Sequence, residues 1–142
     1  MADKLSPETA EIMRERFGRD MPISLATVAD GEPQVRIVDG YYEDGAFYAI
    51  TYLLSDKMRQ LEKHPRAALC GEWFTGHGVG ESLGYILDEK NAELFAKLRE
   101  VFAGWLGNGH VDENDRNNII LKIRLTDGVL FDQGVRYDID FT

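Results

Sequence analysis

The sequence predicts a mainly β (α+β) fold, an antiparallel barrel of six or seven strands with about three appended helices. Short apolar or alternating runs recur along the chain, and tight-turn sequences separate most of them. Only three stretches have the periodicity of a helix. Strands that follow one another through short turns favour an antiparallel barrel over an alternating α/β sheet.

In the first half of the chain, one helix precedes three strands and a second, short helix. Ser6 and Pro7 suit the cap and first turn of the first helix, and Gly18 ends it. His64 ends the second helix, because Pro65 disfavours helical geometry in the residue before it. The predicted strands are residues 22–29, 34–42 and 46–51, with turns at 30–33 and 43–45, and the predicted short helix is 55–63.

In the second half, a glycine-rich segment interrupts the strands. Gly76, Gly78 and Gly80 alternate around His77, which predicts either a tight or bulged connection or a flexible rim over a ligand. The segment lacks the final glycine and the strand-turn-helix context of a dinucleotide-binding fingerprint. The other predicted elements are strands at 66–74, 81–87, 119–126 and 129–131, a helix at 88–106, a loop at 108–118 and a turn at 127–128.

Length and charge limit the classes of function. A chain of 142 residues with 44% hydrophobic content has room for one core, so we expect a single domain over residues 1–142. The net charge of −9 argues against a nucleic-acid or anionic-membrane partner, since both require a basic surface. The sequence contains neither a membrane-spanning window nor a secretory signal, which predicts a cytoplasmic protein.

The residues that usually carry metal or nucleophilic chemistry are sparse. Cys70 is the only cysteine and lies in an apolar run, so we expect a buried, inert thiol without a disulfide. His64, His77 and His110 are not at metal-ligand spacing, and we expect no metal site. Nucleophile-elbow and phosphate-loop motifs are both missing, so nothing supports a hydrolase or a nucleoside triphosphatase.

A phosphate site is one interpretation of the region from Val35 to Pro65. Arg36 lies in the middle of an apolar strand, where a buried cation requires an anion or several acceptors. The strand that ends at Thr51 leads into a helix capped by Ser55, and helix starts commonly hold phosphate oxygens. Lys57 in the first turn opposes the helix dipole unless an anion offsets it. Alternatively, Ser55 is an ordinary cap, Lys57 is solvated, and Arg36 pairs with a carboxylate such as Asp39.

The same residues carry a family resemblance. The order and spacing of residues 36–39, 45–51, 55–61 and 65–69 are similar to the flavin-binding core of the pyridoxamine 5′-phosphate oxidase-like superfamily, over roughly residues 20 to 74. Members of that superfamily are split β-barrels that bind FMN between two subunits. The resemblance implies phosphate contacts from Arg36, Ser55 and Lys57. It implies further flavin contacts from Ile37, Val38, Asp39, Ile50 and Thr51.

Two departures separate this chain from the oxidases that give the superfamily its name. Asp56 stands between the serine and the lysine, where those oxidases usually have a basic residue. The chain after Phe131 lacks the arginine-leucine signature that holds the substrate phosphate. It more closely resembles the short bacterial members, the general stress proteins and the nitroimidazole-reductase-like group, and we do not expect a true pyridoxamine phosphate oxidase.

The resemblance leads to a functional expectation with one alternative. We expect a homodimer with FMN at the subunit interface, which transfers hydride or electrons between a reduced donor such as NAD(P)H and a small acceptor. Because a flavin does the difficult chemistry itself, no catalytic residue is assigned. The alternative is a non-catalytic flavin-binding or haem-binding protein associated with stress, in which His77 or His110 would supply an axial ligand.

Overall fold

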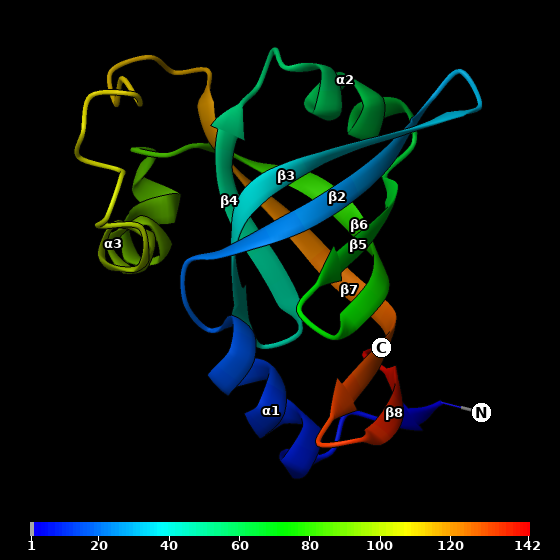
Figure 1. Cartoon of the computed structure of the whole chain (residues 1–142). Coiled ribbons are helices and arrows are strands. Elements are labelled where there is room, and N and C mark those ends of the chain that lie inside the picture. Colours follow the sequence, from blue (N-terminus) through cyan, green and yellow to red (C-terminus); the bar gives the residue numbers. More distant parts are fainter. Residues whose placement is uncertain (1) are drawn as a thin grey trace.

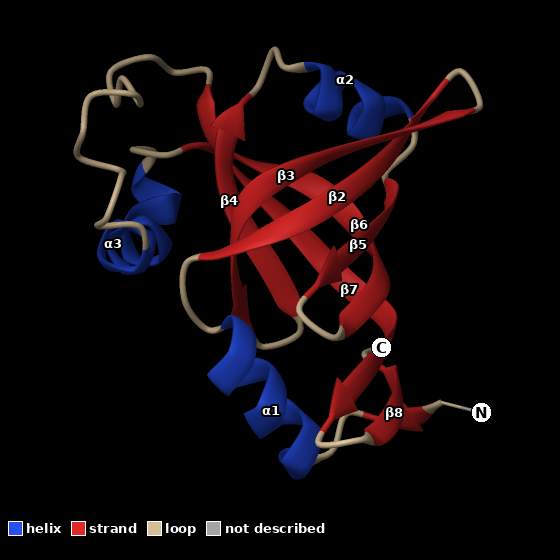
Figure 2. Cartoon of the chain, in the orientation of Figure 1, coloured by secondary structure: helices blue, strands red, loops and turns tan. Residues whose placement is uncertain are grey.

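A computed structural model describes residues 2–142 and shows a six-stranded β-barrel with three helices around it (Figures 1 and 2). The strand order is β1-β8-β7-β4-β3-β2-β5-β6, and β7 also pairs with β6, so six strands close a ring of antiparallel pairs. The mainly β barrel predicted from the sequence is therefore confirmed. The strands are β1 (Asp3–Lys4), β2 (Met21–Ala29), β3 (Glu32–Glu43), β4 (Ala46–Tyr52), β5 (Arg66–Gly71), β6 (Phe74–Tyr85), β7 (Asn118–Asp132) and β8 (Val135–Asp140).

The helices cover the two ends and one side of the barrel. Helix α1 (Pro7–Phe17) lies at one end, α2 (Asp56–Lys63) lies at the other, and α3 (Ala92–Val101), preceded by the 3₁₀ turn η1 (Glu89–Asn91), lies beside β4 (Figure 1). Ser6 caps α1, as the sequence predicts, and Thr9 Oγ1 accepts a reciprocal bond from the Ser6 backbone N–H. Phe17 at the last residue of α1 packs its ring 5.6 Å from that of Phe47 and 5.7 Å from that of Phe74. Helix α1 thus closes its end of the barrel with an aromatic plug.

Two apolar clusters form the core. The larger fills the barrel, and the smaller lies between the outside of the barrel and α3, with Tyr41 and Ile120 contributed by the strands. The third helix ends earlier than predicted, at Val101, and turns follow it. Gly104 lies within those turns, and glycine disfavours helix continuation. Phe102 and Leu106 remain buried in the smaller cluster. None of the helices within residues 2–142 is both long and apolar enough to cross a membrane.

The prediction of a connection at the glycine-rich segment is wrong. Residues 74–85 form one continuous strand, β6, and its glycines at 76, 78 and 80 are buried. A Cβ atom at Gly76 would lie 2.9 Å from the ring of Phe74. At Gly78 it would lie 2.8 Å from Ile123 Cγ2, and at Gly80 it would lie 3.1 Å from the Leu61 side chain. The glycines are therefore required by close packing inside the barrel rather than by a turn.

The predicted turn at residues 127–128 is also wrong, because β7 continues through it to Asp132. An irregularity in the register opposite His77 and Gly78 lets the strand bend without ending. The chain instead reverses at Gln133 and Gly134, whose positive φ angles of 48° and 80° suit a tight hairpin turn, and then forms β8. The sequence pattern did not indicate β8 or the two-residue β1 that pairs with it.

Candidate functional site

The predicted site residues lie around the place where β3 and β4 separate. These strands pair only from Tyr41–Tyr48 to Glu43–Ala46, whereas β2 and β3 pair over nine positions and β4 and β7 over seven. We call the stretch in which residues 32–40 of β3 and 49–52 of β4 are not paired with each other the split. Helix α2 follows β4 directly, and its Gln60 side chain bonds to β2 and β3. The split and the start of α2 therefore form one neighbourhood.

The Arg36 side chain points from β3 toward α2 and is held by neutral acceptors. Its guanidinium donates to Thr27 Oγ1 at 2.7 Å, to Gln60 Oε1 at 3.0 Å and to the Leu25 carbonyl oxygen at 3.3 Å. Among residues 2–142, no carboxylate forms an ion pair with Arg36. Burial lowers the pKa of Arg36, partly offset by the attraction of Asp56. The guanidinium is thus oriented by the protein, but its charge is left without a close counter-ion.

Ser55 occupies the N-cap position of α2 but does not cap the helix. Its side chain makes no hydrogen bond to the first turn, and its Oγ is buried with no partner among the described residues. A buried hydroxyl without a partner is costly, and an uncapped helix start leaves backbone N–H groups free. The alternative that Ser55 is an ordinary cap is therefore wrong. Its geometry suits an acceptor that the protein itself does not supply.

Lys57 adds a second positive charge close to the first. Burial and the nearby charge of Arg36 lower the pKa of Lys57, while Asp56 opposes the shift. Lys57 takes part in none of the ion pairs in the described part of the chain. Two half-buried cations that repel each other at a helix start destabilise the empty site, and an anion would relieve that repulsion.

The other predicted contacts are distributed along the two sides of the split. Ile37 is 71% exposed on the outer surface of β3, whereas Val38 packs against the barrel core. Asp39 is exposed near Asp20, whose pKa is raised by burial and by the charge of Asp39. On β4, Ile50 packs against the α3 cluster and Thr51 is buried. The structure thus brings Arg36, Ser55 and Lys57 together at one end, while these five residues extend away from it on different faces.

Sequence reasoning missed Thr27 and Gln60, which hold Arg36 in place. Thr27 is 1% exposed and continues the inward-facing series of Ile23 and Leu25, so a hydroxyl on the inner face of β2 was a detectable signal. Gln60 carries no such signal, because its contact with β2 and β3 depends on how α2 packs across the barrel.

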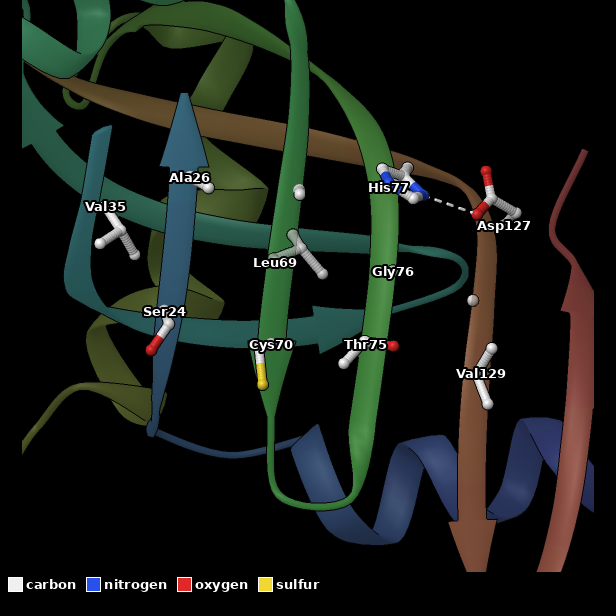
Figure 3. A pocket seen from close by; sticks show the side chains of 12 residues that line it. Ser24, Ala26, Val35, Leu69, Cys70, Thr75, Gly76, His77, Asp127 and Val129 are labelled. Atoms are coloured by element: carbon white, nitrogen blue, oxygen red, sulfur yellow. Dashed lines mark hydrogen bonds and ion pairs between the residues drawn. The ribbon is translucent and has the colours of Figure 1, made fainter. Parts of the chain in front are cut away.

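A second feature lies on the outside of the barrel, where no helix covers the strands (Figure 1). A hollow of about 280 Å³ is lined by outward-facing side chains of β3, β2, β5, β6 and β7, most of them small (Figure 3). At one edge, His77 Nδ1 bonds to Asp127 Oδ1 at 2.8 Å, and this hydrogen bond is the main reason that the pKa of Asp127 is lowered. Cys70 is exposed in this hollow, so the expected buried thiol is wrong.

The first of these features, the site at the start of α2, fits a phosphate group. A phosphate dianion would supply the counter-charge that Arg36 and Lys57 lack, and its oxygens would accept from Ser55 Oγ and from free N–H groups of α2. Asp56 is exposed at the same turn, and its negative charge would repel a phosphate. Within residues 2–142, no group of three or more histidine, cysteine or acidic residues is placed to hold a metal ion.

Comparison with known proteins places this geometry in a family. The family described as pyridoxamine 5′-phosphate oxidase matches residues 10–129, which include the split, α2 and the outer hollow. The chain belongs to the pyridoxamine 5′-phosphate oxidase family. This confirms the resemblance drawn from the sequence and extends it well beyond residue 74. No curated protein sequence matches the chain.

Solved structures share the fold at low sequence identity. General stress protein 26 of Bacillus anthracis is 18% identical, with 84% of this chain and 90% of that one covered and a TM-score of 0.66. An FAD-binding protein of Mesorhizobium loti is 17% identical; the match covers 84% of this chain and 91% of that one, with a TM-score of 0.63. A heme binding protein of Mycobacterium smegmatis is 19% identical, covering 96% and 59% with a TM-score of 0.71. Structural neighbours in this family thus include flavin-binding and haem-binding proteins.

Proposed function

We propose that this protein binds FMN and transfers hydride or electrons between a reduced donor, such as NAD(P)H, and a small acceptor. One observation carries the proposal: within residues 2–142, Arg36 and Lys57 form no ion pair with a carboxylate, and the buried Ser55 hydroxyl beside them has no hydrogen-bond partner. This combination destabilises the empty site and would be relieved by a phosphate group.

The chain's own residues would bind and orient the coenzyme. Thr27 and Gln60 fix the direction of the Arg36 guanidinium, so little side-chain entropy remains to be lost when an anion binds. From that anchor, residues 37–39 of β3 and 50–51 of β4 lead away along the split, in positions for backbone contacts with the rest of the molecule. Bound FMN would supply the redox chemistry, and the protein would position it and admit the second reactant.

A homodimer is part of the proposal. The apolar side chains of Val35 and Ile37 are 70% and 71% exposed on β3, and Tyr52, Leu53 and Leu54 are 39–51% exposed where β4 leads into α2. These residues flank the split. Clusters of exposed apolar side chains commonly mark interaction surfaces, and a second copy of the chain would cover this one.

Haem binding without turnover is the second candidate, and His77 favours it. Because the Asp127 carboxylate can only accept a hydrogen bond, Nδ1 of His77 carries the proton and Nε2 is left free to ligate iron. A haem-binding structural neighbour is consistent with this candidate. It uses the outer hollow, whereas the flavin proposal uses the start of α2.

The visible spectrum of the purified protein separates the two candidates. Flavin absorption, or saturable quenching of FMN fluorescence on titration, supports the first candidate, and a Soret band that His77→Ala abolishes supports the second. Lys57→Glu is expected to weaken FMN binding by a hundredfold or more. The substitution removes an attraction to phosphate worth about 1.5–3 kcal/mol and adds a repulsion of similar size. If the Lys57→Glu variant binds FMN as tightly as the wild type, the proposed phosphate site is refuted. Anaerobic reduction of the bound flavin by NADH or NADPH would then distinguish an enzyme from a carrier.

A further inference from the structure

A pair of arginines lies next to the outer hollow, on the side nearer α2. Along β5, Arg66, Ala68 and Cys70 point outward, and the last two of these line the hollow. Arg66 is paired with Val79 on β6, and Val79 is paired with Arg124 on β7. Residues paired directly across neighbouring strands point to the same face of a sheet, so both arginines share the outer face with the hollow.

Both arginines are exposed and without a carboxylate partner. The Arg66 guanidinium donates to Thr126 Oγ1 at 3.2 Å. Within residues 2–142, neither Arg66 nor Arg124 takes part in an ion pair. The two side chains start from the strands on either side of β6, about 10 Å apart. In a protein with a net charge of −9, they make a local region of positive potential.

The carboxylates of Asp127 and Glu81 lie on the same face, and each has a different basic neighbour. Asp127 Oδ1 is bonded to His77 Nδ1 at 2.8 Å. The pKa of Asp127 is lowered mainly by that bond and, to a smaller extent, by the charge of Arg66. Glu81 is paired directly with Lys122, beyond the arginines. The two guanidinium groups are therefore available to an anion from outside the chain.

The outer hollow can hold the apolar part of a small ligand. Its volume of about 280 Å³ is close to the lower end of the range of ordinary ligand pockets, about 300–1,000 Å³. Most of its lining is apolar, and Figure 3 shows Cys70 and Thr75 toward one end of the strands and His77 and Asp127 toward the other. Residues 66 to 70 of β5 extend over about 13 Å, so a short molecule could reach from the hollow to Arg66.

We propose that the outer hollow, Arg66 and Arg124 form a second ligand site, which binds a small organic acid. Its apolar body would fill the hollow, and its carboxylate would accept hydrogen bonds from the arginines, because a guanidinium matches a carboxylate in shape and charge. A nucleotide fits less well, since its sugar and phosphates are polar and the hollow is apolar. The site shares no residue with the start of α2 and does not depend on the proposed flavin.

Cys70 reports directly on the hollow, because it is the only cysteine and is exposed in it. Octanoate, a straight-chain carboxylate, should slow alkylation of Cys70 by iodoacetamide in the full-length protein, and the effect should saturate. Octylamine has a similar apolar chain and the opposite charge, and it should protect Cys70 roughly tenfold less well. Equal protection by both compounds would overturn the role of the arginines. Absence of protection by octanoate would overturn the site.

Substitutions locate the carboxylate. Arg66→Ala and Arg124→Ala should each weaken octanoate binding about three- to tenfold, because each removes a charged hydrogen-bond donor on an exposed surface. Asp127→Asn should strengthen binding, because it removes a negative charge that repels the ligand. Arg19→Ala, at an exposed position between α1 and β2, is the matched control and should have no effect. Unchanged binding in both arginine variants, or weaker binding in Asp127→Asn, would overturn the assignment.

Titrations with FMN and haem separate this site from the functions proposed above. Arg66→Ala should bind FMN normally, and Lys57→Glu should retain the protection of Cys70 by octanoate. Loss of that protection in Lys57→Glu would place the carboxylate at α2 and overturn the inference. Haem in the hollow should also protect Cys70, but His77→Ala should abolish only the effect of haem. Loss of both effects in His77→Ala would refute a separate site for organic acids.

Discussion

Lys57→Met should stabilise the coenzyme-free protein and weaken FMN binding at the same time. In the empty site, Lys57 is partly buried, faces Arg36 and opposes the dipole of α2 at its first turn. A charge of unfavourable sign at a helix end costs about 0.3–1 kcal/mol, and methionine retains most of the apolar length of the side chain. For a chain of this size, relief of about 0.5–1 kcal/mol raises Tm by about 1–4 °C.

FMN affinity should change in the opposite direction. Loss of one charge-assisted hydrogen bond to phosphate costs about 1.5–3 kcal/mol, which weakens binding by about 10- to 150-fold. Thermal unfolding measured by circular dichroism without FMN, and fluorescence titration with FMN, give the two quantities. Lys63→Met is the matched control on the same helix. Lys63 lies in the last turn, where its charge favours the dipole, so this variant should be neutral or slightly destabilised and should bind FMN normally.

The pH dependence provides a separate check on the same reasoning. Because the pKa of Lys57 is lower in the folded protein than its ordinary value of 10.5, the unfolded chain binds its proton more tightly. Wild-type stability should therefore gain a contribution as pH rises through the folded pKa toward 10.5, and Lys57→Met should lack it. A lower Tm for Lys57→Met without FMN, or the same effect on FMN binding from Lys63→Met, would refute the strained-cation argument.

Three further predictions concern stability. Gly128→Ala should lower the free energy of unfolding by about 1–3 kcal/mol, because the new Cβ would lie 2.6 Å from an aromatic ring in the barrel. Gly104→Ala is the control and should be neutral or slightly stabilising, because a Cβ there has nothing within 4 Å. Urea unfolding measures both variants. Asp20→Asn should raise Tm at pH 7 but not at pH 3, because burial and Asp39 raise the pKa of Asp20, so its ionised form is the destabilising one. Burial raises the pKa of Tyr41 to about 12, so ionisation of Tyr41 in the unfolded chain lowers stability between pH 10 and pH 12. Tyr41→Phe should reduce this loss but not abolish it, because burial also raises the pKa values of Tyr42 and Tyr48.

The sequence was a good guide to elements held by local rules. Ser6 and Pro7 fixed the start of α1, and turn residues fixed the β2–β3 and β3–β4 hairpins. The sequence led to wrong predictions where one residue type can serve two structural roles. Glycine allows a turn and also allows close packing, and only the position of Phe74 inside the barrel shows that Gly76 and Gly128 serve packing.

The candidate site divides in the same way. The sequence predicted a site at Arg36, Ser55 and Lys57, because a cation in an apolar strand and a cation at a helix start are visible in the order of residues. Their partners were not visible. Gln60 meets Arg36 from a different element, and Ser55 makes no side-chain capping bond although it stands at the N-cap of α2.

By itself, then, the sequence determined which segments form strands and which form helices, because capping, turn geometry and side-chain alternation act over a few residues. It also showed where a positive charge occupies an unfavourable position, in an apolar strand or at a helix start. Only the tertiary structure decided that β3 and β4 separate, that Arg36 forms no ion pair within residues 2–142, and that side chains of five strands line one outer hollow. Those features depend on register between strands distant in the chain, and register is set by how the barrel closes as a whole.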